Sequence, residues 1–335
     1  MKKINIAING FGRIGRNLFK LLLENPSIDV VAINDLADTK TMAHLLKYDS
    51  IHGILKHDVS CDEHHIIIDN KKIPFYNEKD ISGLDWKALN VDYVVEATGK
   101  RKTYDLLKQH IDQGAERVIL SVPPEDNVIK TIVLGVNQDI LTGEELIISN
   151  ASCTTNNAAP MVKVIKELCG MEQAYITTVH SYTTDQSLHD QPHKDLRRAR
   201  GAAQSIVPTT TGAAKALTKI FPEYEGKIGG GGIRVPVPDG SLTDITCYVK
   251  RDVSIDEINT AFKQAAETDL KGILAYTEDP IVSVDILGNT NSCLFDAQLT
   301  SVLDKMVKIV GWYDNEIGYS SRLIDLITYF DKIKK

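Results

Sequence analysis

The sequence predicts an α/β protein in two parts: a doubly wound parallel sheet domain, then an α+β domain with a mostly antiparallel sheet. Four observations lead to this prediction. Up to about residue 150, short apolar runs alternate with segments of helical periodicity. A glycine-rich turn follows the first apolar run, and after residue 150 the apolar residues alternate with polar ones over longer runs. With 335 residues, the chain is long enough for two domains.

The spacing of apolar residues predicts the elements of the first part. Ile4–Ile8 is a predicted strand, Arg13–Glu24 has helical spacing, and Ile28–Ile33 is a second strand. This order makes a βαβ unit, whose two strands are parallel neighbours. The further predicted elements are strands at Tyr93–Ala97, Val118–Ser121, Ile132–Val136 and Leu146–Ile148, and a helix at Tyr104–Gly114.

The second part is predicted to open with a helix from Cys153 to Gly170 and to close with an amphipathic helix at Ile317–Lys334. Between them lies Ser181–Thr210, a polar, Arg-rich segment with little periodicity, which we expect to be a functional loop. The predicted strands are Gln173–His180, Gly232–Pro236, Leu242–Lys250 and Val307–Tyr313.

Composition excludes several classes of function. Lys and Arg number 38 against 45 Asp and Glu, a net charge of −7, so we expect no attraction to nucleic acid or an anionic membrane. The apolar runs are too short to span a bilayer, and Met1-Lys2-Lys3 is followed by polar Asn5, so no signal peptide is expected. The five scattered cysteines form no disulfide pattern and indicate the cytoplasm, and the histidines, His64-His65 included, have no metal-ligand spacing.

The glycine-rich turn has the pattern of a dinucleotide site. Gly10, Gly12 and Gly15 form G-x-G-x-x-G between a predicted strand and helix, and Asp35 lies 20 residues past Gly15. The glycines permit a sharp turn, a close approach of backbone to a pyrophosphate, and tight packing of helix on strand. Asp35 would bind the adenosine ribose hydroxyls and repel a 2′-phosphate, which favours NAD over NADP. A glycine turn without a ligand, with Asp35 as a loop or capping carboxylate, is the alternative.

Cys153 is the candidate nucleophile. It opens a predicted helix directly after a strand, and the helix dipole lowers the pKa of a thiol at that position. A lone cysteine is more often a small buried apolar residue. Its flanking residues in Ser149–Asn156 are small and polar, which suits a site better than a core.

Four motifs together resemble the phosphorylating glyceraldehyde-3-phosphate dehydrogenase family, bacterial type. They are Ile8–Arg16 (INGFGRIGR), Ser149–Asn156 (SNASCTTN), Thr209–Lys215 (TTTGAAK) and Trp312–Tyr319 (WYDNEIGY), in the family's order. The resemblance covers nearly the whole chain. It implies a Rossmann-type NAD-binding domain at residues 1–152, joined by the C-terminal helix 317–335, and a catalytic domain at residues 153–316.

The resemblance also implies the reaction. Cys153 attacks the aldehyde of the triose phosphate, hydride leaves for NAD, and inorganic phosphate releases the resulting thioester as an acyl phosphate. His180 is the matching general base, although spacing alone places it no nearer Cys153 than any other histidine, and a structural histidine at a strand end is the commoner case.

The resemblance assigns the binding residues too. Residues implied to hold the phosphate groups are Ser152, Thr154, Thr183, Arg198, Thr211, Gly212 and Arg234, with Arg197 an open alternative to Arg198. Residues implied to hold NAD are Gly10, Gly12, Arg13, Ile14, Gly15, Asp35, Lys79, Ser121 and Asn315. Ser181–Thr210 matches the loop that packs across a subunit interface, so a homotetramer is implied.

The chain departs from the family pattern at four places. Asn157 stands where most members have a second cysteine, Lys100-Arg101-Lys102 where an aromatic lies near the adenine, and Gly229–Gly232 before Arg234 where the stretch is more ordinary. Gln191-Pro192 has the proline of NAD-type members but not their leucine, so NADP use stays open. The nearest alternative activity is erythrose-4-phosphate dehydrogenase, which hydrolyses its acyl intermediate. A non-catalytic NAD-binding protein on the same scaffold is the other alternative.

Overall fold

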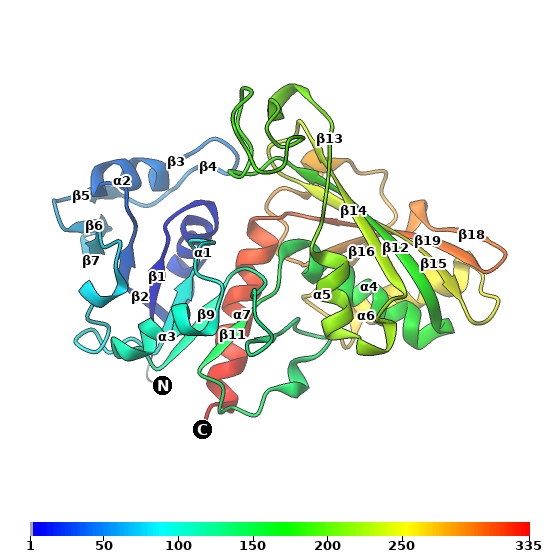
Figure 1. The fold of residues 1–335 in the computed structure, drawn as a ribbon, viewed down its shortest axis with the longest axis horizontal. Coiled ribbons are helices and arrows are strands. Elements are labelled where there is room, and N and C mark those ends of the chain that lie inside the picture. The colour runs from blue at the N-terminus through cyan, green and yellow to red at the C-terminus, as the bar shows by residue number, and fades with distance from the viewer. Residues whose placement is uncertain (1–2) are drawn as a thin grey trace. The chain divides into compact units, whose positions relative to one another are not determined.

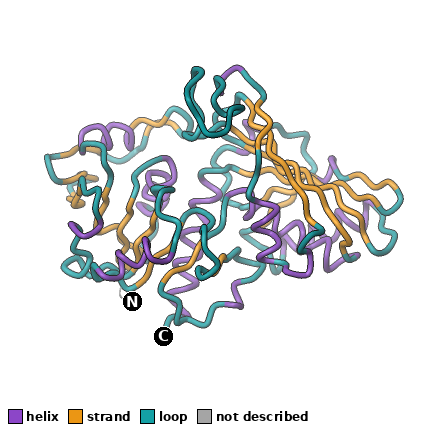
Figure 2. Tube along the Cα trace, in the orientation of Figure 1, coloured by secondary structure: helices purple, strands orange, loops and turns teal. Residues whose placement is uncertain are grey.

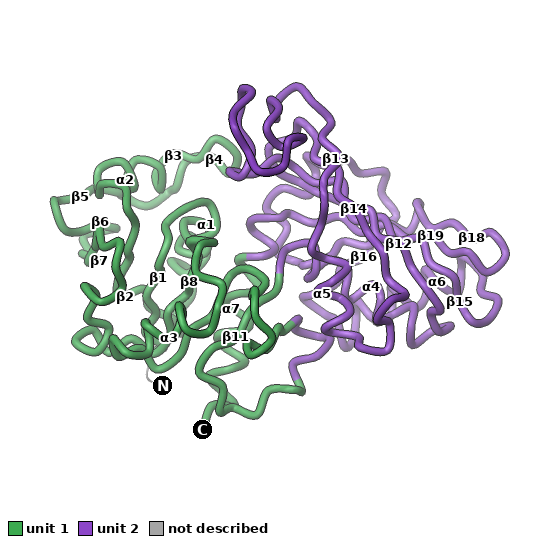
Figure 3. Tube along the Cα trace, in the orientation of Figure 1, with its two compact units in different colours: residues 1–132, 139–151, 320–335 green, residues 133–138, 152–319 purple. Residues whose placement is uncertain are grey.

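A computed structural model describes residues 3–335. Met1 and Lys2 lie outside the described residues. They belong to the predicted first domain and to the N-terminal segment in which no signal peptide is expected. The chain divides into two compact units, residues 1–132, 139–151 and 320–335 in the first and residues 133–138 and 152–319 in the second (Figure 3). Within residues 3–335, no helix combines the length and apolarity that crossing a membrane requires.

The first unit is built on a nine-stranded sheet of strand order β10-β11-β9-β8-β1-β2-β7-β6-β5 (Figure 1). The strands from β10 to β7 pair in parallel, as the βαβ reading requires, and β7-β6-β5 form an antiparallel edge. The bounds are β1 Ile4–Asn9, β2 Ile28–Asn34, β5 Val59–Cys61, β6 His65–Ile68, β7 Lys71–Tyr76, β8 Tyr93–Glu96, β9 Arg117–Leu120, β10 Lys130–Thr131 and β11 Ile147–Ser149; β3 Tyr48–Asp49 and β4 Gly53–Ile54 form a separate small pair.

Three helices accompany this sheet, α1 Arg13–Leu23, α2 Thr39–Lys47 and α3 Tyr104–Asp112. One sheet face is apolar because Ala7, Ala32, Val94 and Val118 pack there with Leu107 of α3. The predicted strands and helices of the βαβ unit are therefore confirmed to within a residue or two. Neither α2 nor the antiparallel edge was predicted from the sequence.

The second unit has an eight-stranded mixed sheet of order β13-β14-β12-β15-β19-β17-β16, with β18 also paired to β19. Most pairs are antiparallel, but β12 pairs with β14 in parallel, and β16 with β17. The bounds are β12 Met171–Ser181, β13 Val207–Thr209, β14 Ile228–Val235, β15 Ser241–Val249, β16 Leu274–Thr277, β17 Cys293–Asp296, β18 Ser301–Leu303 and β19 Met306–Tyr313.

The helices of this unit are α4 Cys153–Cys169, α5 Ala213–Ile220 and α6 Ile255–Glu267. The last helix, α7 Ile317–Ile333, lies in the first unit from Ser320 onward. Short 3-10 helices lie at Ile81–Gly83, Gln138–Ile140, Ala202–Gln204, Pro222–Tyr224, Ser283–Ile286 and Ala297–Leu299. Apart from the Ala202–Gln204 turn and β13, the predicted functional loop after β12 has no regular element (Figure 2).

One predicted strand is wrong. Ile132–Val136 is not a strand; only Lys130–Thr131 before it pairs, as β10. The chain turns instead, because Gly135 has φ +80° and Val133 O accepts from the backbone N–H of Val136 and of Asn137. The residues are apolar because Ile132 and Val133 are buried, and burial rather than extended backbone produced the pattern.

The four glycines of Gly229–Gly232 form a strand despite the entropic cost of ordering them. A Cβ on Gly230 would lie 2.9 Å from Ile176 O, so this position has no room for a side chain. The ring of Tyr175, opposite Gly229 in the neighbouring strand, lies over Gly229 and Gly231 and covers the backbone that they leave bare.

Candidate functional site

The glycine turn of the first unit has the shape of a phosphate cradle. Gly10 has φ +98°, and a Cβ there would lie 2.6 Å from Thr98 N. A Cβ on Gly15 would lie 2.2 Å from Gly10 O, so both positions require glycine. Gly12 is the N-cap of α1, and a Cβ there would meet nothing within 4 Å. The open space beside Gly12, at the N-terminus of α1 where backbone N–H groups point outward, fits a dinucleotide pyrophosphate.

Asp35 lies directly after β2, and its carboxylate is fixed against the glycine turn. Oδ2 accepts from Phe11 N at 2.7 Å and Oδ1 accepts from Ala37 N at 3.0 Å. A carboxylate has about four lone-pair sites, so these two bonds leave acceptor capacity for ribose hydroxyls. The two bonds therefore orient the carboxylate of Asp35 and leave it able to accept hydrogen bonds from ribose hydroxyls.

The remaining predicted cofactor residues of the first unit surround the same strand ends. Arg13 turns its guanidinium to Asp49 at 2.9 Å, so any pyrophosphate contact of Arg13, as of Ile14 in the same turn of α1, is through backbone N–H. Ser121 follows β9 and donates its N–H to Glu96 O at 3.0 Å. Arg101, which stands near the expected aromatic position, donates from Nη2 to the carbonyl of Lys79 at 2.8 Å.

Cys153 is the first residue of α4, in the second unit. Ser152 caps this helix, since its Oγ accepts from Thr155 N at 3.1 Å. The cap places the sulfur at the N-terminal end of α4, where backbone N–H groups point outward. Ser152 and Thr154 therefore present backbone N–H groups beside the thiol.

The structure brings three predicted residues of the second unit together. Cys153 Sγ lies 3.5 Å from His180 Nε2, and the other ring nitrogen, Nδ1, lies 2.8 Å from Ser181 O and 2.6 Å from Arg234 Nη1. His180 and Arg234 face each other across the parallel pair β12–β14, in register. The neighbouring strands thus place a base next to the thiol and a guanidinium behind the base.

Burial dominates the electrostatics of this group. It lowers the pKa of His180, with the charge of Arg234 acting in the same direction, to about 3. Burial also raises the pKa of the Cys153 thiol, and the charge of Arg234, the hydroxyl of Thr154 and the N–H groups of Thr154 and Cys153 lower it only in part. The expectation that the helix N-terminus lowers this pKa below its usual value is therefore wrong for the chain by itself, because desolvation outweighs the dipole.

A second set of hydroxyls anchors the site in the core. The hydroxyl of Thr154 bonds to Tyr313 OH at 2.9 Å, which also bonds to Thr178 Oγ1 at 3.0 Å. The Thr154 hydroxyl thus links the start of α4 to Tyr313 of β19. The sequence analysis did not single out Tyr313, although it belongs to the WYDNEIGY motif.

The other predicted phosphate residues lie at the start of α5 and in the preceding loop. Thr211 Oγ1 accepts from Ala213 N at 3.2 Å, and Gly212 is the N-cap of α5. Arg198 is partly buried, donates to Thr209 Oγ1 at 2.8 Å and pairs with Asp185, whereas Arg197 is exposed. Thr183, two residues beyond β12, is half-buried.

Asn315 is held with its amide in one orientation. Its Oδ1 accepts from Ser181 Oγ at 2.8 Å and from Ser241 Oγ at 2.6 Å. Ser241 Oγ accepts from Ser181 N, so its own proton goes to Asn315. The amide nitrogen of Asn315 is left as a donor, the chemistry needed to bind a carboxamide oxygen. Sequence alone gave no sign of the two serines.

Asn157, the residue at the usual second-cysteine position, is buried in α4. Its Nδ2 donates to Trp312 O at 3.2 Å. It therefore tethers α4 to β19 and offers no thiol beside Cys153.

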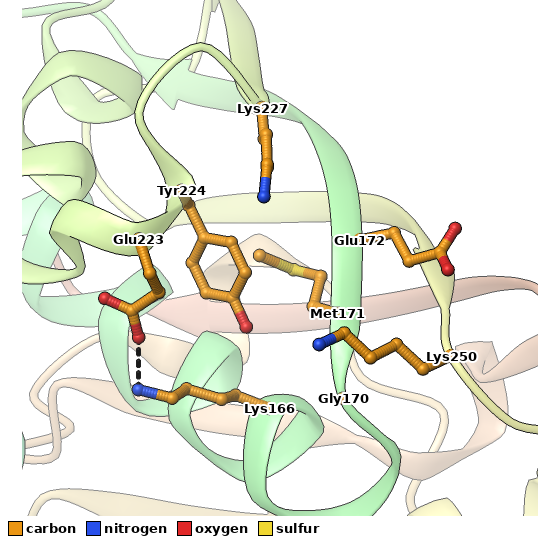
Figure 4. Close-up of a pocket in the computed structure, with 8 residues that line it drawn as sticks. All are labelled: Lys166, Gly170, Met171, Glu172, Glu223, Tyr224, Lys227 and Lys250. Carbon is orange, nitrogen blue, oxygen red and sulfur yellow. Dashed lines mark hydrogen bonds and ion pairs between the residues drawn. The ribbon is translucent and has the colours of Figure 1, made fainter.

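The second unit also has a pocket of about 550 Å³ away from these residues (Figure 4). It is lined by the C-terminal turn of α4, the start of β12 and the chain around Tyr224. Lys166 in its wall pairs with Glu223, and the wall contains neither cysteine nor histidine. The pocket therefore carries none of the predicted chemistry.

Comparisons with known proteins agree over nearly the whole chain. Residues 4–104 match the family model described as the NAD binding domain of glyceraldehyde 3-phosphate dehydrogenase, and residues 152–315 match its C-terminal domain. A glyceraldehyde-3-phosphate dehydrogenase of Geobacillus stearothermophilus is 51% identical over 328 residues, covering 97% of this chain and 98% of that protein. One from Streptomyces coelicolor is 54% identical over 330 residues, with 97% and 98% covered.

Proposed function

Because this chain belongs to the glyceraldehyde-3-phosphate dehydrogenase family, we propose that it oxidises D-glyceraldehyde 3-phosphate with NAD and phosphate to 1,3-bisphosphoglycerate. The chain is an NAD-dependent oxidoreductase. The observation that carries the assignment of roles is the group of Cys153, His180 and Arg234, with Sγ 3.5 Å from Nε2. We assign cofactor binding to residues 1–152 with helix 317–335, and the chemistry to residues 153–316.

In our proposal, Cys153 is the nucleophile and His180 its base. His180 acts as the base in the tautomer that carries its proton on Nδ1, with Arg234 Nη1 donating to Ser181 O rather than to the ring. In that tautomer Nε2 is unprotonated and faces Sγ, so it can accept the thiol proton as sulfur adds to the aldehyde carbon. His180 returns this proton to the alkoxide oxygen, which gives a thiohemiacetal, and takes it back from the hydroxyl as the hydride leaves. NAD, when bound, supplies the oxidation by accepting hydride from that carbon. The acyl group is left on Cys153 as a thioester.

Phosphate groups meet the donors around the sulfur. We propose that Arg234 and Thr183, with Arg198, hold the phosphate of the triose. The backbone N–H groups of Ser152 and Thr154, with Thr211 and Gly212, hold the attacking phosphate. An oxygen of this phosphate attacks the thioester carbon, the C–S bond breaks, and the thiol of Cys153 is restored. Helix N-termini suit this role because their N–H groups point at the anion.

We propose that the adenosine half and the pyrophosphate of the dinucleotide bind at the strand ends of the first unit. We assign the nicotinamide carboxamide to Asn315, as the resemblance implies. The glycine turn, Arg13 and Ile14 receive the pyrophosphate, and Asp35 the adenosine ribose. Lys79 and Ser121 line the adenosine half. The fixed carboxylate of Asp35 supports NAD over NADP, since a 2′-phosphate would bring like charges together.

Steady-state assays of NADH formation test the proposal. With glyceraldehyde 3-phosphate, the rate is expected to depend on inorganic phosphate, and with erythrose 4-phosphate it is expected to be far lower. Equal rates with and without phosphate would show that water, not phosphate, releases the acyl group, as in an erythrose-4-phosphate dehydrogenase. The same assays with NADP in place of NAD measure the cofactor preference.

We further propose a homotetramer in the cytoplasm. One face of the second unit's sheet carries exposed apolar side chains, including Tyr175, Tyr248 and Leu303, which supports burial against another copy. All five cysteines are unpaired, which supports a reducing compartment. Light scattering coupled to size-exclusion chromatography tests the assembly, and a monomer at micromolar concentration would contradict it.

A further inference from the structure

Three adjacent strands of the first unit end on buried polar residues that bond to one another. Asn9 ends β1, Asn34 ends β2 and Glu96 ends β8, and the three stand opposite one another in register. Asn34 Nδ2 donates to Asn9 Oδ1 at 2.8 Å, and Asn9 Nδ2 donates to Glu96 Oε2 at 2.6 Å. We call these three residues the strand-end cluster. Burying polar side chains costs desolvation free energy that apolar side chains at the same strand ends would not cost. The presence of two asparagines and a glutamate here therefore calls for an explanation.

The carboxylate of Glu96 is saturated with neutral donors. Oε2 accepts from Asn9 and from His110 Nε2 at 3.2 Å, and Oε1 accepts from Thr98 N at 2.9 Å and from the Thr98 hydroxyl. The side chain is 0% exposed, and among residues 3–335 no lysine or arginine pairs with it. Burial raises the pKa of Glu96, but the donors of His110, Thr98 and Asn9 outweigh it and leave the pKa lowered. The buried anion is thus held by hydrogen bonds from Asn9 and Thr98 and by its contact with His110.

The tautomer of His110 follows from its second partner. Trp86 Nε1 donates to His110 Nδ1 at 3.0 Å, and an indole nitrogen can only donate. Nδ1 must therefore accept, so the proton is on Nε2 and points at Glu96. Trp86 and His110 are both fully buried. Trp86 fixes the orientation of His110 behind the carboxylate, and within residues 3–335 the two rings make no other hydrogen bond.

The residues of the strand-end cluster lie next to the segments that we assign to cofactor binding, and they hydrogen-bond to them. Gly10 follows Asn9 and donates its N–H to Asn34 O at 2.8 Å, and Asp35 follows Asn34. Asn34 also bonds through its side chain to both N and O of Glu78, at 2.9 Å each, next to Lys79.

The bonds of Glu96 extend this pattern to two more segments. Its side chain holds the Thr98 turn, and its backbone carbonyl accepts from Ser121 N. The glycine turn, the acidic residue after β2, the Lys79 segment and the Ser121 segment all serve the adenosine half of the proposed site. Glu96 is therefore linked to all of these segments: its carboxylate reaches them through Asn9, Asn34 and Thr98, and its backbone carbonyl contacts Ser121 directly.

We propose that Glu96 is a positioning residue of the dinucleotide site, oriented by His110 and acting through Asn9 and Thr98 on the turns that bind the adenosine half. It rests on the proposed NAD binding. The cluster touches no reacting atom, so it sets the affinity for the cofactor and leaves the chemical step alone. Preorganised turns bind more tightly because less order is lost on binding.

The test replaces Glu96 with glutamine. The amide keeps the size of the side chain but turns one acceptor oxygen into a donor, so at least one of the four donors loses its partner and the turn that it holds is released. Val94→Ala is the matched control, since Val94 is fully buried in the same strand and makes only apolar contacts with the core. Trp86→Phe is a milder second variant, which removes only the donor that orients His110.

Calorimetric titration of the full chain with NAD and with ADP-ribose gives the readout, together with steady-state kinetics. E96Q is expected to weaken both ligands about tenfold or more and to raise KM for NAD equally, with kcat within about twofold at saturating NAD. W86F is expected to weaken them by about two- to threefold, and V94A not at all. ADP-ribose lacks the nicotinamide, so a parallel loss places the effect in the adenosine half.

Failure of the positioning role of Glu96 can be distinguished from failure of the proposed NAD binding. If the wild-type chain binds neither NAD nor ADP-ribose, the proposed function fails. If the wild type binds both and E96Q and W86F bind them equally well, the positioning role is wrong. An equal loss in V94A would also overturn it, since general destabilisation would then suffice. Should E96Q not fold, W86F against V94A decides the question.

Discussion

Replacing Arg234 with glutamine is expected to raise the pKa of the Cys153 thiol further. The guanidinium contacts the far side of the imidazole that faces the sulfur, and its charge favours thiolate. Glutamine removes the charge and keeps a polar side chain in the same strand. The reactive thiolate then becomes scarcer at neutral pH.

The size of this effect follows from the geometry. The contacts through the ring of His180 place Arg234 and the sulfur roughly 8 Å apart, where Coulomb's law with an effective dielectric constant of about 20 gives about 2 kcal/mol. That energy corresponds to about 1.5 pKa units, and solvent screening at the open side of the site reduces it to about one unit. At any pH below the pKa, a rise of about one unit lowers the thiolate fraction of Cys153 about tenfold.

Alkylation by iodoacetamide measures the thiolate directly. The rate at Cys153, followed by peptide mass spectrometry, is expected to rise with pH through and beyond pH 9 in the wild type, because burial raises this pKa. In R234Q the profile is expected to move about one unit upward, with about tenfold slower alkylation at pH 8 and equal rates at high pH. Arg200→Gln, which removes an exposed arginine paired with Asp190, is the control and should not move the profile. An unmoved or downward-moved profile in R234Q would refute the electrostatic argument.

Three further outcomes are expected. His180→Asn should lower kcat by about 10²- to 10⁴-fold while calorimetry shows unchanged NAD binding, and a kcat near wild type would remove His180 as the base. Gly10→Ala should abolish NAD binding and lower the free energy of unfolding by about 1–3 kcal/mol, since φ is +98° and Cβ would lie 2.6 Å from Thr98 N; retained binding would contradict the close approach. Burial and the charge of Asp314 raise the pKa of Asp239 to about 9, so folding must retain a proton that the unfolded chain gives up above about pH 4. Asp239→Asn should therefore gain thermal stability over wild type as pH rises from 5 to 8, and a gain that shrinks over this range would contradict the shift.

The parts of the fold that follow a local rule were predictable from sequence. The βαβ unit was found because β1, α1 and β2 each have a clear period and the glycine turn marks their junction. The strand predicted at Ile132–Val136 was wrong because a buried turn and a buried strand have the same apolar composition. Gly135 was the one residue in this run typical of a turn. The strands β5 to β7 were missed because their alternation is short and interrupted.

The site divides in the same way. The motifs identified Cys153 and His180 as candidates. Their 3.5 Å contact could not be predicted, because it depends on how the start of α4 packs against the end of β12, and the two residues lie 27 positions apart in the sequence. The orientation of Asn315 depends on Ser181 and Ser241, which no motif joined to it. Likewise, the reversal of the expected thiol pKa comes from burial, a property of the packed chain that composition around Cys153 does not contain.

The most direct test of the account is to trap the acyl group. Wild-type chain is mixed with NAD and glyceraldehyde 3-phosphate in the absence of inorganic phosphate, quenched with acid, and analysed by mass spectrometry while NADH is followed by absorbance. One NADH per chain is expected, together with a 3-phosphoglyceroyl adduct on the Cys153 peptide that disappears when phosphate is added before the quench. Steady NADH formation without any adduct, or an adduct on another cysteine, would contradict the covalent mechanism at Cys153.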